Sequence, residues 1–174
     1  LTLPTPKADE AYRKHSLSHW WTNGLRIALQ AHRMIHAGEL KSASETIDAL
    51  SFHGESMAKQ QAIAVTKGEF TEWRRALVNL EMLTANLRGK LALAGPPSSH
   101  GSAFNWFRAA ADRQRTATLM HPPLILTPMD NDLGDYFLST KQPAKALEAY
   151  QEAIKKFPNE PSTLELIKKA EAAE

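Results

Sequence analysis

Two pairs of histidines, each spaced four residues apart, are the side chains whose types and spacing could most readily do chemistry. His32 and His36 form one pair, and His15 and His19 form the other. Because an α-helix has about 3.6 residues per turn, each pair would face one side of a helix and could hold a transition metal. Residue 33 is Arg, so the Glu of the H-E-x-x-H zinc motif is missing, and so is a third ligand. We therefore expect no metal ion and no other cofactor, and keep a histidine-based metal or small-ligand domain as an alternative.

The sequence offers no convincing nucleophile with a base beside it. Ser98, Ser99 and His100 place hydroxyl groups next to an imidazole, but in a segment rich in Pro and Gly that we expect to be a loop. The absence of Cys excludes thiol catalysis, disulfides and Cys-based zinc sites. A G-x-S-x-G motif and a Gly-rich phosphate loop are also missing. We therefore expect a protein that is not an enzyme.

Length and composition fit one globular domain. The chain has 174 residues, of which 43% are hydrophobic, enough for a real core. Its 21 basic and 19 acidic residues give a formal charge of +2 with both signs dispersed, so we expect no nucleic-acid partner. No apolar run approaches the roughly 20 residues that span a bilayer, so we expect no membrane insertion. Because the chain starts at Leu1 without a signal sequence, we expect a processed chain or a piece of a longer protein.

The elements that must position these side chains are helices. After an extended arm at 1–8, apolar residues recur every three or four positions through a single domain over 9–174. Prolines make 119–128 non-helical, and the PPSSHGS segment from Pro96 is expected to be a loop. The segment 51–68 is undecided between helix and loop, because Gly54 could end or kink a helix there. The helices are predicted at about 9–37, from 39 onward, at 69–94, 102–118, 129–140 and 143–157, and from Pro161. They group into hairpins at about 9–66, 69–118 and 127–160, followed by a capping helix at 161–174.

The segment from Thr127 to Glu160 has the most specific spacing. Its packing residues are Leu133, Gly134, Phe137, Ala146, Tyr150, Ala153 and Pro158. The small side chains let two antiparallel helices approach closely, the aromatic rings fill the space between them, and the late Pro stops the second helix. This order closely resembles the tetratricopeptide repeat, a 34-residue helix–turn–helix. One departure is Asp130, which stands where the repeat has a Trp.

Beyond this repeat, the chain is similar to the C-terminal part of a family of large bacterial tetratricopeptide proteins of undefined biochemical role. The resemblance lies in FRAAAD at 107–112, HPPLILTP at 121–128, LGD at 133–135, QPAKALEAYQEAI at 142–154 and FPNE at 157–160, with a looser fit at 36–47. It implies an all-α fold, a right-handed α–α superhelix or solenoid of about three hairpins with a C-terminal cap. It also implies a bacterial source, which leaves cytoplasm and periplasm open, and it supplies no catalytic motif.

In such a stack the first helix of each hairpin lines a concave face that binds partners. Fixed offsets from the packing residues Phe137 and Met34 select the positions that face it, and the match to Leu91 in the third helix selects a small and apolar stretch, Gly89, Ala92 and Leu93. An Asp at 135 would repel a peptide carboxylate, so a clamp for the C-terminus of a chaperone is rejected. The predicted partner-binding residues are Ala28, His32, Ile35, His36, Asp135 and Leu138.

The preferred function is a non-enzymatic scaffold that binds an unidentified protein or peptide segment on a preformed surface. A structural alternative is a module that caps a larger solenoid or forms a homodimer through Trp20 and Trp21. Trp73 and the Trp106-Phe107 pair are expected in the core, and the Lys155-Lys156 pair on a solvated helix face.

Overall fold

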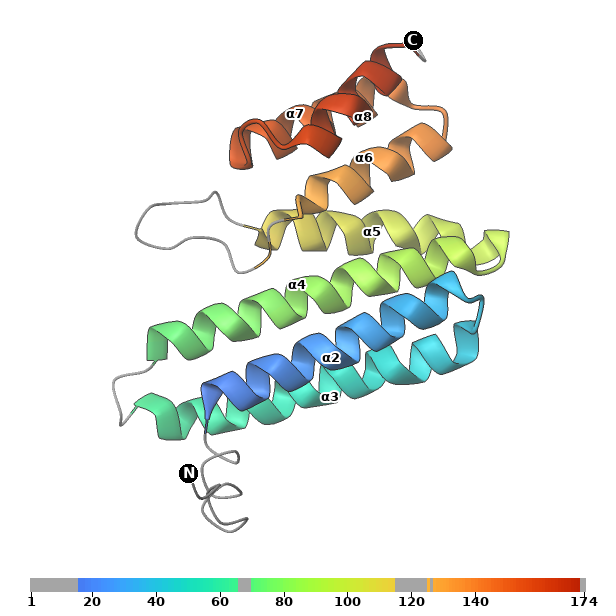
Figure 1. Ribbon diagram of the computed structural model, residues 1–174. Coiled ribbons are helices and arrows are strands. Elements are labelled where there is room, and N and C mark those ends of the chain that lie inside the picture. Colours follow the sequence, from blue (N-terminus) through green and yellow to red (C-terminus); the bar gives the residue numbers. More distant parts are fainter. Residues whose placement is uncertain (1–15, 66–69, 115–124, 126, 173–174) are drawn as a thin grey trace, which may run out of the picture.

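Helices make up nearly all of the chain that the computed structural model describes, which is residues 16–65, 70–114, 125 and 127–172 (Figure 1). Within these residues the fold is all-α, as predicted, and the helices pack as sequential antiparallel pairs. The pairs are α2 with α3, α4 with α5, and α6 with α7, and α8 packs mainly on α7. The helices are α2 (Leu17–His36), α3 (Leu40–Val65), α4 (Phe70–Ala94), α5 (Pro97–Arg113), α6 (Met129–Ser139), α7 (Pro143–Lys156) and α8 (Pro161–Glu171).

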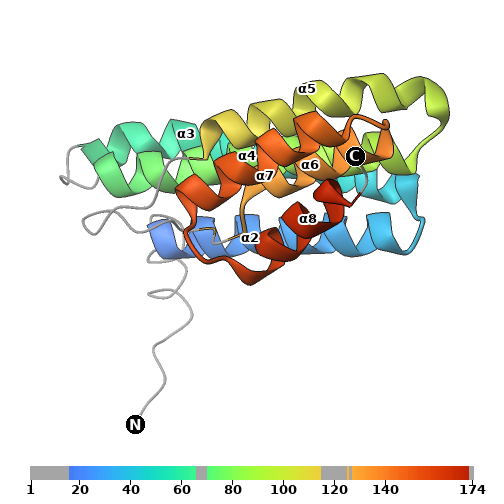
Figure 2. The ribbon, with the colours of Figure 1, turned by 90° about the horizontal axis from the view of Figure 1, so that it is seen from above.

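The pairs follow one another in space in the order of the sequence, from α2 and α3 at one end to α7 and α8 at the other (Figure 1). Seen from above, the helix axes run in roughly one direction, with α3 and α5 along one side and α2 and α8 along the other (Figure 2). The core is correspondingly divided into three clusters. The first lies between α2, α3 and α4, the second between α4, α5 and α6, and the third between α7 and α8 with side chains from α6.

Two glycines allow the closest helix contacts. A Cβ added to Gly134 would collide with the ring of Tyr150 on α7, and one added to Gly89 would lie 2.6 Å from Cε1 of Phe107 on α5. The predicted Gly134–Tyr150 contact is therefore present, and α4 and α5 repeat it. Of the other predicted packing residues, those buried are Leu133, Ala146 and Ala153, while Phe137 is half-buried and Pro158 lies exposed in the turn after α7.

The Gly89–Phe107 contact corrects the predicted alignment of α4 by one residue. Gly89 corresponds to Gly134, so the residue equivalent to Phe137 is Ala92 and the predicted match to Leu91 is wrong. The reason is that α4 has Ala92 at the position where α6 has the packing aromatic Phe137. The prediction used the neighbouring Leu91 instead because it is large.

Several predicted boundaries also change. α3 continues through Gly54 to Val65, which makes 51–65 helical, since an internal glycine costs a helix only about 1 kcal/mol relative to Ala. The predicted loop from Pro96 is wrong, since α5 begins at Pro97, and a first-turn position tolerates Pro because its missing N–H has no helical partner there. α5 ends at Arg113 rather than at 118, because Gln114 has an extended backbone.

Gln114 fastens the end of α5 to the start of α6. Its side chain is buried, with Nε2 donating to the carbonyl of Thr127 at 2.8 Å and Oε1 accepting from the N–H of Met129 at 2.7 Å. Of the predicted non-helical segment 119–128, the described residues 125, 127 and 128 are indeed outside helices, and Ile125 packs on the second cluster. The predicted arm at 1–8, the predicted helix start at 9 and His15 lie outside the described residues.

Lys156 corrects the prediction of a solvated lysine pair. Its Nζ lies 2.7 Å from Oδ2 of Asp130 and 3.0 Å from the carbonyl oxygen of Ala111, and it thereby joins α5, α6 and α7. The side chains of Lys156 and Asp130 are only 19% and 8% exposed. Asp130, at the position where the tetratricopeptide repeat has a Trp, thus takes part in a partly buried ion pair.

The capping helix α8 was expected to turn Leu164, Ile167 and Ala170 inward; Ala170 and Ile167 do pack in the third cluster, and only Leu164 departs from the prediction. Leu164 is 43% exposed, whereas Thr163 and Ala170 are fully buried. Thr163 exchanges hydrogen bonds with the side chain of Asn131 on α6 at 2.9 and 3.0 Å, and its N–H and hydroxyl both reach Glu160 at the start of α8. This polar network fixes α8 against α6.

Candidate functional site

A row of polar side chains crosses α2, α4 and α6 on one face of the molecule, and we call it the polar row. Lys90 and Asp135 directly follow the buried glycines of α4 and α6, and His32 directly follows the buried Ala31 of α2. One residue is about 100° around a helix, so each of these side chains emerges beside the contact that its helix makes with its partner. The members of the polar row are His32, His36, Asn86, Lys90, Asp132 and Asp135.

The centre of the polar row is a carboxylate held on both oxygens by α4. Nζ of Lys90 lies 3.1 Å from Oδ1 of Asp132, and Nδ2 of Asn86 donates to Oδ2 of Asp132 at 2.7 Å. The Lys90 and Asp132 side chains are 29% and 21% exposed, so the pair is partly desolvated yet reachable from solvent. Its geometry is fixed before any partner arrives, which reduces the entropic cost of binding.

The α2 end of the polar row presents imidazole groups. The rings of His32 and His36 meet edge to face with their centroids 4.6 Å apart. Burial lowers the pKa of His32, Lys90 and His36 lower it further, and only Asp132 opposes them. His32 is therefore neutral at pH 7, when one ring nitrogen donates and the other accepts. Among the residues that the structure describes, no group of three or more His, Asp or Glu side chains is placed to hold a metal ion.

The α6 end of the polar row carries a second carboxylate. Asp135 accepts a hydrogen bond from the Tyr150 hydroxyl at 2.7 Å, and burial together with this bond raises the pKa of Tyr150. Desolvation also raises the pKa of Asp135, and the nearby Asp132 carboxylate raises it further. The hydrogen bond from Tyr150 acts in the opposite direction and lowers it. Lys169 on α8 acts electrostatically on Asp135 and extends the charged face to the capping helix.

The predicted partner-binding residues divide into two groups. His32, His36 and Asp135 belong to the polar row: the two histidine rings are in contact at its α2 end, and Asp135 lies at its α6 end, with Lys90 and Asp132 acting electrostatically on both His32 and Asp135. Ala28 is buried in the first cluster with 7% exposure, so it contributes packing rather than contact area. Ile35, between His32 and His36 on α2, is half-buried against the first cluster, and Leu138, about one turn after Asp135 on α6, is half-buried against the third.

Asn86, Lys90 and Asp132 are the members of the polar row that sequence reasoning missed. The sequence predicts that Gly89 faces the partner as part of a small, apolar stretch on α4. This is wrong, because Gly89 is buried and the neighbouring Lys90 reaches the solvent instead. The sequence does contain a signal: Lys90 follows a packing glycine just as Asp135 does. Asp132 carried no such signal, because its role depends on α4.

The tryptophans are distributed as follows. Trp73 is buried, as predicted, whereas Trp106 is only half-buried and lies under the Arg88 guanidinium, 5.0 Å from its ring centroid. Trp20 and Trp21 are half-buried against the first cluster. The carbonyl of Trp20 is 2.8 Å from Nε2 of the buried His53, so this end of α2 is anchored inside the protein.

No protein-family model matches this chain, and neither the curated proteins nor the solved structures include a significant match to it. The resemblance to tetratricopeptide repeats therefore stays a prediction. Along the described helices, none is both long enough and apolar enough to cross a membrane.

Proposed function

We propose that this chain is a non-enzymatic scaffold that binds an extended protein or peptide segment along the polar row. The observation that carries the proposal is the Asp132 carboxylate, which Lys90 and Asn86 hold in place across the α4–α6 boundary. Charged groups held this way on neighbouring helices give an extended chain a fixed series of contacts.

The order of groups along the polar row describes the segment that it would accept. The His32 imidazole at the α2 end suits backbone amides, and the carboxylates of Asp132 and Asp135 suit a Lys or Arg side chain. Ile35, next to His36 on α2, and Leu138, about one turn after Asp135 on α6, can cover apolar side chains of the segment. A free C-terminal carboxylate is disfavoured beside Asp135.

The arrangement also supports the tetratricopeptide architecture as a proposal. Sequential antiparallel pairs and the repeated contact of a glycine with an aromatic ring are what a right-handed stack of such repeats requires. In that architecture the polar row would line the concave face.

Selection of short random peptides on the purified chain tests the proposal. We expect the selected peptides to be enriched in Lys or Arg and to lose about tenfold in affinity for Asp132→Asn, since a charge-assisted contact contributes about 1.4 kcal/mol or more. Glu45→Gln is the matched control, because it removes one negative charge from an exposed position on α3. Peptides that bind Asp132→Asn as well as the parent chain would contradict the assignment of the site.

A further inference from the structure

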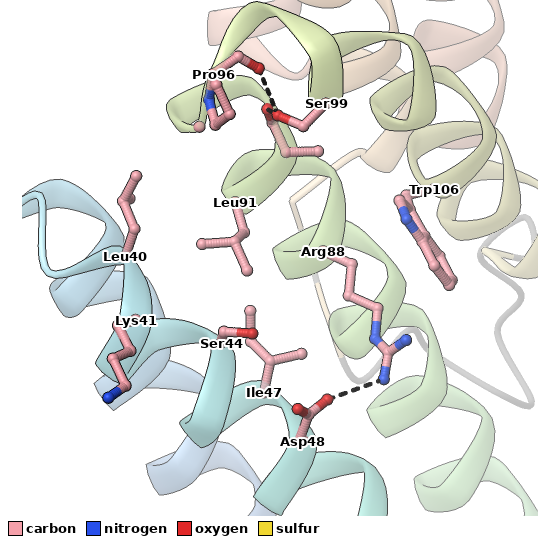
Figure 3. A pocket seen from close by; sticks show the side chains of 12 residues that line it. Leu40, Lys41, Ser44, Ile47, Asp48, Arg88, Leu91, Pro96, Ser99 and Trp106 are labelled. Atoms are coloured by element: carbon pink, nitrogen blue, oxygen red, sulfur yellow. Dashed lines mark hydrogen bonds and ion pairs between the residues drawn. The ribbon is translucent and has the colours of Figure 1, made fainter.

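A hollow lies between α3, α4 and α5 (Figure 3), and the residues of α4 that line it are different from those in the polar row. Its volume is about 490 Å³, within the range of small-molecule sites. Arg88 and Leu91 line it from α4, and at about 100° per residue both lie well around the helix from Lys90. Leu40, Leu91 and Ile47 gather on one side of Arg88, and Trp106 lies on the other (Figure 3). We call this hollow the Arg88 cavity.

Arg88 is positioned to receive an anion. Its guanidinium stacks over the Trp106 ring and donates from Nη2 to Oγ of Ser51 at 3.1 Å. Nε of Arg88 is buried and finds no acceptor among the described residues, although an unsatisfied buried donor costs free energy. The neighbouring Asp48 is a weak competitor, because its oxygen is 3.4 Å from Nη2 and its side chain is 71% exposed.

The charge and polarity of the Arg88 cavity restrict its ligand. Arg88 and Lys41 oppose the single carboxylate of Asp48, which leaves one excess positive charge. The remaining wall is mainly aliphatic, from Leu40, Ile47, Leu91, Ala92 and Pro96. A ligand that matches this wall carries one negative group and an apolar body.

We propose that the Arg88 cavity binds a small organic acid, with its carboxylate on Arg88 and its apolar tail along the aliphatic wall. A peptide C-terminus has the same chemistry but fits less well, because each of its backbone N–H and C=O groups needs a partner. The single proton of the Ser99 hydroxyl is already engaged, because Oγ lies 2.7 Å from the carbonyl oxygens of both Ala92 and Pro96. The free acid has no such groups to satisfy. This site is independent of the polar row and of the function proposed for it.

Titration calorimetry of the whole chain with octanoate at pH 7 tests the proposal. With about ten non-hydrogen atoms, octanoate is expected to bind one site with a millimolar dissociation constant. Octanol supplies the tail alone and acetate the carboxylate alone, and we expect each to bind about tenfold more weakly or not at all.

Variants locate the binding. Arg88→Met removes the charge and Ser44→Trp fills the cavity from an exposed lining position, and each is expected to weaken octanoate at least about tenfold. Arg26→Met is the matched control on α2, where the exposed arginine hydrogen-bonds to the Asn23 side chain; it should leave binding unchanged. Asp48→Asn should tighten binding by removing the competing carboxylate. Circular dichroism confirms that each variant is folded.

Equal octanoate affinity in the parent chain and in both Arg88→Met and Ser44→Trp would overturn the proposal, as would the lack of saturable binding. A short blocked peptide ending in a free Leu carboxylate, if it bound more tightly than octanoate, would overturn the assignment to a free acid. Neither outcome depends on the polar row, so failure here leaves the proposed scaffold function separately testable.

Discussion

Removal of the Lys156 ammonium should destabilise the chain more than the loss of any exposed charge. Lys156→Met leaves the Asp130 carboxylate at 8% exposure without its ion-pair partner, and breaking a buried pair from one side costs about 3–5 kcal/mol. Because Lys156 keeps 19% exposure, we expect the lower end, about 3 kcal/mol. For a domain of this length that corresponds to a decrease in Tm of about 6–12 °C.

Urea denaturation followed by circular dichroism measures this loss. Replacing both partners, as in Asp130→Leu with Lys156→Met, should recover most of the stability, because apolar side chains of similar volume often equal a buried ion pair. Lys155→Met is the matched control: its lysine pairs with Glu152 on the exposed surface, so the denaturation midpoint should stay where it is in the parent chain.

The pH dependence gives a second test of the same pair. Desolvation already raises the pKa of Asp130, and Lys156 is the main group that opposes the rise. In Lys156→Met the folded-state pKa of Asp130 therefore lies further above the unfolded value of about 3.9. When the folded-state pKa of a carboxyl group is raised, the free energy of unfolding is reduced by the full amount at pH values above the folded-state pKa. The reduction disappears as the pH falls toward the pKa of the unfolded state. The deficit of the variant should be smaller at pH 4 than at pH 7; an unchanged deficit, or a single variant as stable as the parent, would refute the reasoning.

Three further predictions concern other contacts. Gly134→Ala should cost about 1–3 kcal/mol in urea denaturation, because the new methyl group meets a ring on α7, whereas Gly101→Ala has open space within α5 and should stabilise by up to about 1 kcal/mol. Thr163→Val should cost about 1–3 kcal/mol and increase amide hydrogen exchange in α8, because it leaves a buried amide on α6 without its partner. In an NMR titration His32 should protonate at a pH below the usual histidine value, and Lys90→Met should shift its pKa upward, since that lysine now lowers it; no shift would show that the two groups lie too far apart to interact.

The order of the helices could be predicted because local spacing encodes it. The spacing of Gly134 and Tyr150 within one short stretch predicts a close helix pair, and the structure places the two residues in contact. The start of α5 could not be predicted in this way, because Pro97 is compatible both with a loop and with a first helical turn, and the sequence alone does not distinguish them.

The candidate site was less predictable, because its residues act across helices. Lys156 looks like a solvated lysine until Asp130, 26 residues earlier, is placed beside it. Lys90 and Asp132 are likewise 42 residues apart in number and belong to different pairs, and a one-residue error in aligning α4 was enough to hide Lys90. His32 and Asp135 could be proposed from the packing positions of their own helices, Ala31 and Gly134, without knowledge of a second helix.

The Gln114 side chain links the end of α5 directly to the start of α6, in addition to the backbone that connects the two helices. It fixes the first residue of α6 to the end of α5 through one buried amide. The placement of α6 against α5 therefore depends on this one amide as well as on apolar packing, and not on the number of residues between the two helices in the sequence.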